Sequence, residues 1–198
     1  EEPEPEQMAY IRAALQRFED ALYSSQFADP DLGYRAYVDL DSLVDSYLVS
    51  EFTMQLDAFY TSTWFYKKRG DDRFRFGPMW DFDVAVAPVN DIITTPWPAN
   101  VPWVRNPLIN FRRGGAGVWL ERLFQDPTFV AAIHDRWQEL KDPFRSLIEE
   151  LDEMQAPLLP AIGADSVRWD RGTLGDYHRA SAIQSWMRAR WAWMNSAM

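Results

Sequence analysis

The segment Trp80-Asp81-Phe82-Asp83 carries two carboxylates one residue apart, each preceded by an aromatic side chain. In an extended segment side chains alternate between faces, so Trp80 and Phe82 point one way. Asp81 and Asp83 then point the other way, and carboxylates this close need a cation, a proton or an arginine between them. A divalent cation such as Mg²⁺, which prefers oxygen ligands, suits the pair. From the tetrapeptide alone, the plainer interpretation is favoured: a half-buried strand with a solvated acidic face.

The composition suits a folded chain that does not bind nucleic acid. Its 198 residues fit one domain or one large lobe, and 47% are hydrophobic, with ten Trp, twelve Phe and eight Tyr to fill a core. A net charge of −10 argues against nucleic acid or an anionic membrane as a partner. The absence of Cys excludes disulfides, zinc–thiolate sites and cysteine nucleophiles. No apolar run reaches the length of a transmembrane segment.

The chain opens with the acidic, proline-rich sequence EEPEPEQ. This composition is typical of a linker or a boundary, so we assign residues 1–6 to it and residues 7–198 to a single lobe. The chain is therefore expected to be a piece of a longer protein.

Helices are predicted before the acidic segment. Apolar residues recur at spacings of 3 and 4 over residues 5–25, which indicates an amphipathic helix. Asp41 is a suitable N-cap for a second helix that runs to about Met54. Glu51 falls on the buried face of that helix. It either reaches solvent at the helix end or forms a structural pair with an arginine, because an unpaired buried carboxylate is costly.

The region around the acids is predicted to be β. Residues 62–66 and 74–76 are rich in aromatic residues and are predicted as two strands, with a charged turn between them. Residues 79–86 are predicted as a third short strand that carries the acids. The expected fold class is α+β, mainly α, with one small antiparallel hairpin region as its only β structure.

A long loop and further helices follow. Residues 87–117 are rich in Pro and Gly, and a loop of this length is usually a functional lid or a binding loop. Trp97 and Trp103 either pack this loop down or line a ligand site. Four helices are predicted after it, over residues 118–124, from 129 to 140, from 147 onward and over 176–196.

The sequence GPMWDFDVA, with its Trp-Asp-Phe-Asp block, resembles the signature of the CotH kinase family, the spore coat protein H-like atypical kinases. YVDLDSLVDSYLVSEFT from Tyr37, STWFYKK from Ser62 and the terminal WMRARWAWM are similar to other parts of that family. The resemblance covers nearly the whole chain. It implies a remote protein-kinase-like fold, of which this chain is the helical C-terminal lobe, and a bacterial spore coat, cell-surface or secreted location.

The resemblance also implies roles for individual residues. Asp81 looks like the metal-binding aspartate of kinases, and Asp83 supports it or shares the metal. Asp57 looks like the family's other active-site aspartate, which orients or deprotonates the acceptor hydroxyl or contributes to the metal site. Gln55 takes the place of an Asn in the family's Asn-x-Asp triplet, so Gln55 and Asp83 are the expected cofactor-binding residues. Glu51 matches a glutamate before this triplet and is assigned a structural role.

The chain departs from the family pattern in three respects. Gln55 extends the amide by one methylene, on the order of 1.5 Å. The segment after Asp83 lacks the family's glycine, and its Asn is displaced to Asn90. The family's nucleotide-binding lobe is expected before residue 1, since residues 1–36 contain only Gly33 and no glycine-rich phosphate loop.

Two functions follow from these observations. The first is metal-dependent phosphoryl transfer from ATP to protein Ser or Thr, with Mg²⁺ or Mn²⁺, in which this chain alone is expected to be inactive. The second is a catalytically inactive CotH-like domain that serves as a peptide-binding, glycan-binding or structural module of the bacterial surface.

Overall fold

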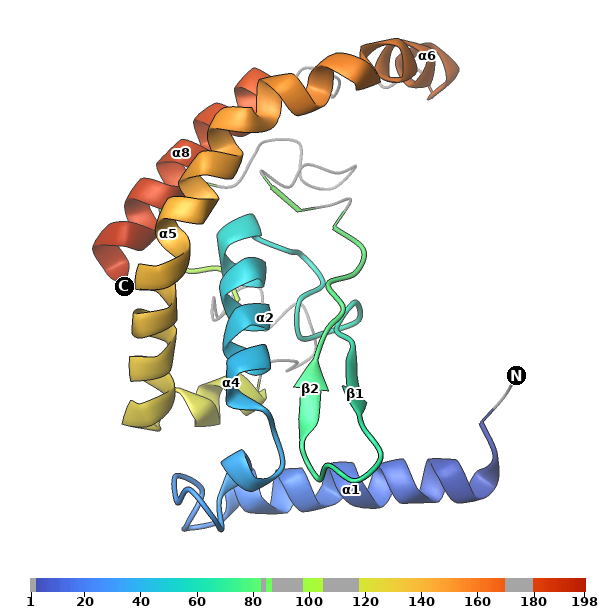
Figure 1. The fold of residues 1–198 in the computed structure, drawn as a ribbon, viewed down its shortest axis with the longest axis vertical. Helices are drawn as coiled ribbons and strands as arrows, with labels where there is room; N and C mark the ends of the chain where they lie inside the picture. Colours follow the sequence, from blue (N-terminus) through green and yellow to red (C-terminus); the bar gives the residue numbers. More distant parts are fainter. Residues whose placement is uncertain (1–2, 83–84, 87–97, 105–117, 170–179) are drawn as a thin grey trace.

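The computed structural model describes residues 3–82, 85–86, 98–104, 118–169 and 180–198 (Figure 1). Within these ranges the chain is mainly helical with one small antiparallel sheet, which confirms the predicted class at this level. The elements are α1 (Pro5–Tyr23), η1 (Tyr34–Ala36), α2 (Leu40–Thr53), β1 (Phe65–Lys67), β2 (Phe74–Phe76), α4 (Val118–Leu123), α5 (Pro127–Gln155), η2 (Ala156–Leu158), α6 (Leu159–Trp169) and α8 (Ala180–Ala197).

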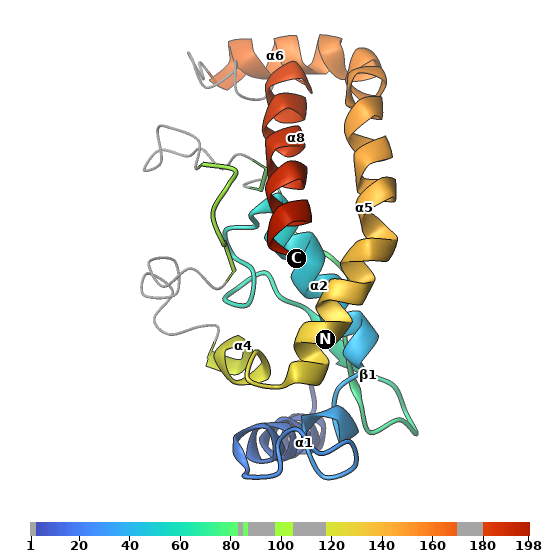
Figure 2. The ribbon, with the colours of Figure 1, turned by 90° about the vertical axis from the view of Figure 1, so that its left-hand side faces the viewer.

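The longest element is α5, which lies antiparallel beside α8 (Figures 1 and 2). The side chain of Asp126 caps α5 by accepting a hydrogen bond from the backbone N–H of Thr128. The prediction of two successive helices here is wrong, because α5 continues through Pro143. Proline removes one helical hydrogen bond, but Trp137 and Ile148 are buried on either side of it and hold both halves against the core.

Helix α2 lies between α5 and the hairpin (Figure 1). Its N-cap is Asp39, whose side chain accepts from the backbone N–H of Ser42 at 3.1 Å, and not the predicted Asp41. Much of α2 is buried, including Leu43, Leu48 and Phe52. Burial on several sides explains why α2 is the element on which the others pack. No described helix combines the length and apolar character needed to cross a membrane.

Strands β1 and β2 form the predicted hairpin, with Phe65 opposite Phe76 and Lys67 opposite Phe74. The bounds of β2 are those predicted, and β1 begins three residues later than predicted. Phe65, Phe74 and Phe76 turn toward the core, where Phe65 packs across the hairpin against the rings of Phe74 and Phe76. Cross-strand aromatic packing of this kind stabilises a two-stranded sheet that would be marginal alone.

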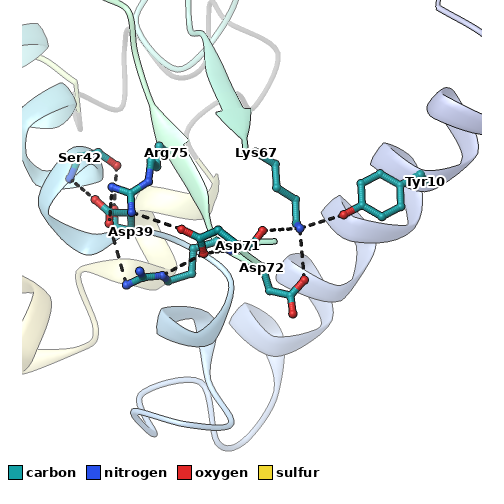
Figure 3. A network of polar contacts seen from close by, with 8 residues as sticks. Tyr10, Asp39, Ser42, Lys67, Asp71, Asp72 and Arg75 are labelled. Carbon is teal, nitrogen blue, oxygen red and sulfur yellow. Dashed lines mark hydrogen bonds and ion pairs between the residues drawn. The ribbon is translucent and has the colours of Figure 1, made fainter. Parts of the chain in front are cut away.

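A polar network fixes the turn end of the hairpin to α1 and to the start of α2 (Figure 3). The ammonium of Lys67 donates to the hydroxyl of Tyr10 at 2.9 Å and pairs with Asp72 at 3.2 Å. The guanidinium of Arg75 pairs with Asp39 at 2.9 Å. Because one end of the hairpin is anchored in this way, the chain that leaves β2 starts from a defined position.

Candidate functional site

A buried ion pair lies beneath the candidate site. Glu51, in the last turn of α2, pairs with Arg190 of α8 at 2.6 Å, and their side chains are 2% and 0% exposed. Of the two alternatives for Glu51, the structural pair with an arginine is therefore correct, and the more common one, a helix-end residue that reaches solvent, is wrong. Burial lowers the pKa of the Arg190 guanidinium, and the Glu51 carboxylate opposes this shift. A charge pair this deep is tolerated because its remaining hydrogen-bonding positions are also used.

The remaining hydrogen-bonding groups of Glu51 and Arg190 hold the segment of residues 98–104 against the end of α2. The carboxylate of Glu51 accepts from the backbone N–H of Trp103 at 2.7 Å and of Val104 at 2.8 Å. The guanidinium of Arg190 donates to the carbonyls of Ala99 and Val101 and to the carbonyl of Glu51 itself. The end of α2, the 98–104 segment and α8 thus meet at one fully hydrogen-bonded centre.

Gln55 follows directly on this centre. Helix α2 ends at Thr53 and is capped by Met54, whose φ of 51° is left-handed, and the backbone N–H of Gln55 donates to the carbonyl of Ser50 at 3.0 Å. The Gln55 side chain, in a residue that is 1% exposed, accepts from the backbone N–H of Asp57 at 3.1 Å. Its amide nitrogen donates to the backbone carbonyl of Asp81. One buried side chain therefore joins the two segments that carry the expected catalytic acids.

Asp81 lies at the surface in an unusual backbone conformation. Its φ of 63° is left-handed, and its carboxylate accepts a hydrogen bond from the hydroxyl of Ser62 at 3.2 Å. The predicted third strand is wrong for the described part of residues 79–86, which contains no strand. The left-handed residue breaks the alternation of an extended segment. Trp80 is accordingly 58% exposed and not anchored in the core, and it meets Trp64 edge-on at 6.3 Å between ring centroids.

Of the other two expected site acids, the structure describes Asp57 but not Asp83. Asp57 is half-buried, and its backbone carbonyl accepts from the N–H groups of Tyr60 and Thr61 at 3.0 and 3.1 Å. Asp83 lies outside the described residues, so its expected roles in metal and cofactor binding stay predictions. Within the described ranges, no three His, Cys, Asp or Glu side chains are grouped closely enough to hold a metal ion.

Two hollows lie near α2, and neither Asp57 nor Asp81 lines either of them. A small one is lined by residues that include Gln55, Ser62, Trp64, Trp80 and Phe82. A larger cavity of about 1040 Å³ lies between α2, the start of α5 and the end of α8. We place the candidate site beside the small hollow, because Gln55 and Ser62 line it and both contact Asp81.

Sequence reasoning missed Ser62 and Arg190, which shape the site, and left the role of Trp103 open. Ser62, which contacts the Asp81 carboxylate, was noted only as part of a strand. Trp103 is fully buried and donates its indole N–H to the carbonyl of Gln55 at 2.9 Å, so it packs the loop down; Trp97 lies outside the described residues. Arg190 carried a detectable signal, since it stands three residues after Met187 and four before Met194 on the apolar stripe of its helix.

One comparison with known proteins identifies the family of this chain. The profile of the CotH kinase protein family matches residues 1–194. The chain therefore belongs to the CotH kinase family. Neither a search of curated proteins nor a search of solved structures gives a significant match.

Proposed function

We propose that this chain is the C-terminal lobe of an atypical kinase that transfers the γ-phosphate of ATP to protein Ser or Thr. The observation that supports the proposal most is the position of Gln55, whose one side chain joins the segments of Asp57 and Asp81. Membership of the CotH kinase family and the mainly helical fold agree with it. Phosphoryl transfer requires positioning and charge neutralisation more than covalent chemistry, and acids held by a rigid helix end meet that requirement.

The two described acids take different roles in this proposal. Asp81 is exposed, so its carboxylate is accessible to a ligand, and we assign it to the metal. Asp57 orients or deprotonates the acceptor hydroxyl, or contributes to the metal site. Asp83 supports Asp81 or shares its metal, as the family resemblance implies.

The described side chains fit a hard divalent cation in their chemistry. Mg²⁺ and Mn²⁺ prefer carboxylate, hydroxyl and water oxygens, and the Asp81 carboxylate stands beside the Ser62 hydroxyl. A bound cation with ATP would supply neutralisation of charge on the phosphates. Asp81 holds and orients such an ion, with Asp83 as the expected second carboxylate. The Gln55 amide is engaged at both ends by backbone groups, so we assign it to positioning.

A second candidate function is supported by the exposed aromatic residues beside the acids. Trp64 and Trp80 are more than half exposed and contact each other, and Tyr60 and Met79 are exposed nearby in the sequence. Large exposed aromatic residues are enriched where proteins bind partners. A CotH-like domain without catalysis would use this surface to bind a peptide or a glycan.

The test that separates the two functions is transfer of labelled phosphate. The full-length protein, with any residues that precede Glu1, is incubated with Mg²⁺, γ-labelled ATP and a mixture of bacterial surface proteins. We expect label on Ser or Thr of a protein acceptor, and none when Mg²⁺ is removed by chelation. A folded full-length protein that transfers no label, with Mg²⁺ or with Mn²⁺, contradicts the kinase and favours the binding module.

A further inference from the structure

We propose that Gln55 is a positioning residue that sets the backbone conformation of Asp81 and ties it to the segment of Asp57. This inference rests on the proposed phosphoryl-transfer function. The Gln55 side chain contacts the backbone carbonyl of Asp81 and the backbone N–H of Asp57. Its role is therefore to place the two acids relative to each other, not to take part in the reaction.

Gln55 is itself held rigidly, which a positioning residue requires. Its backbone N–H donates to the carbonyl of Ser50, and its backbone carbonyl accepts from the indole N–H of Trp103. Its side-chain oxygen and nitrogen contact Asp57 and Asp81. Backbone and side chain thus both have partners in a residue that is almost completely buried. Loss of a hydrogen-bond partner is costly for a polar group that is buried in this way.

The contact with Asp81 opposes backbone strain. A left-handed conformation is unfavourable for a non-glycine residue, although less so for aspartate than for most, so contacts that fit it stabilise it. The Asp81 carbonyl points to the Gln55 amide in this conformation and accepts its hydrogen bond. The same conformation aims the Asp81 carboxylate at the hydroxyl of Ser62. Gln55 therefore stabilises the geometry in which the carboxylate is presented.

A second contact holds the far end of the same segment. The backbone N–H of Val86 donates to the carbonyl of Thr53 at 2.6 Å, and Val86 is also left-handed, with φ of 55°. A β-branched residue in this region is a true outlier. Gln55 thus contacts the chain at Asp81, and Thr53 contacts it at Val86. The end of α2 therefore supports the segment that carries the acids.

The reach of glutamine is the critical property. A shorter amide, by one methylene or about 1.5 Å, cannot contact Asp57 and Asp81 together from the same backbone position. A carboxylate of the same length keeps the acceptor for Asp57 but loses the donor to Asp81. Gln55→Asn and Gln55→Glu therefore separate the two contacts, and Gln138→Asn on the exposed face of α5 is the matched control.

The experiment measures amide exchange and carbon chemical shifts by NMR on the full-length protein. In Gln55→Asn we expect the Asp57 amide proton to exchange at least tenfold faster than in the wild type. In Gln55→Glu we expect that proton to stay protected while the carbonyl ¹³C resonance of Asp81 moves upfield. The Trp103 indole proton, which is donated to the Gln55 backbone carbonyl and not to its side chain, should stay protected in each variant. Unchanged Asp57 exchange and Asp81 shift in these variants would overturn the proposal.

Activity gives the readout that a purely structural role would not change. At a temperature where each variant is folded, kcat for phosphoryl transfer should fall at least tenfold in Gln55→Asn and Gln55→Glu, and not in Gln138→Asn. Full activity in both Gln55 variants, with altered NMR signals, would reduce Gln55 to a stabilising residue and overturn its positioning role. The NMR measurements need no nucleotide. If they show the contacts while the wild type transfers no phosphate, the proposed function fails and the assignment to the site fails with it.

Discussion

Replacing Arg190 by Met is expected to lower the free energy of unfolding by about 3–5 kcal/mol, the cost of breaking a buried ion pair by removing one partner. The carboxylate of Glu51 would stay buried without its cationic partner, with the backbone N–H groups of Trp103 and Val104 as its remaining donors. The carbonyls of Ala99 and Val101 would lose their donor as well. Urea denaturation of the two proteins measures the difference.

Arg188→Met is the matched control for this prediction. Arg188 lies on the same helix and pairs with Glu149, but both side chains are about half exposed. Exposed ion pairs contribute little to stability because solvent and salt screen them, so we expect a much smaller loss than in Arg190→Met. Equal losses in the two variants would mean that the Arg190 pair is no more important than a surface contact, and the proposed anchoring of α2 would be wrong.

Asp81→Asn is expected to lower kcat for phosphoryl transfer by on the order of 10³-fold, the effect of removing a group that stabilises transition-state charge. Asn has nearly the same shape and still accepts from Ser62, so the loss would reflect the missing charge. Asp135→Asn, on the exposed face of α5, controls for the change of net charge. The measurement is initial rate at saturating Mg–ATP, with unfolding followed in parallel to show that the variant is folded. A rate within a factor of two of the wild type would remove Asp81 from the proposed metal site.

The hairpin and the burial of Glu51 could be predicted because their causes are local. Aromatic residues near Phe65 and Phe74 favour strands, and the helical period places Glu51 inward. Its partner could not be predicted from spacing alone, because Arg190 is 139 residues away and becomes a neighbour only when α8 packs on α2. The arginine on the apolar stripe of α8 was a signal, but it did not identify which acid it meets.

The backbone conformation at Asp81, in contrast to the hairpin, could not be predicted from the local sequence. The alternation of aromatic and acidic residues predicted a strand, although aspartate is depleted in strands and is one of the few non-glycine residues enriched in the left-handed region. This local preference is weak, so the sequence around Asp81 does not identify the turn. In the structure, the left-handed conformation of Asp81 is held by the Gln55 amide, which donates to the Asp81 carbonyl from 26 residues away. A contact made in tertiary structure thus overrides the local pattern, as is common where backbone strain meets a functional site.

The most direct measurement of the account is calorimetric titration of the full-length protein with Mg–ATP, on the wild type and on Asp81→Asn. If Asp81 holds the metal that accompanies the nucleotide, the wild type binds Mg–ATP and the variant binds it at least tenfold more weakly, a difference of about 1.4 kcal/mol. The same affinity in both proteins, or no binding to a folded wild type, would contradict the central claim that the segment held by the end of α2 presents a metal–nucleotide site.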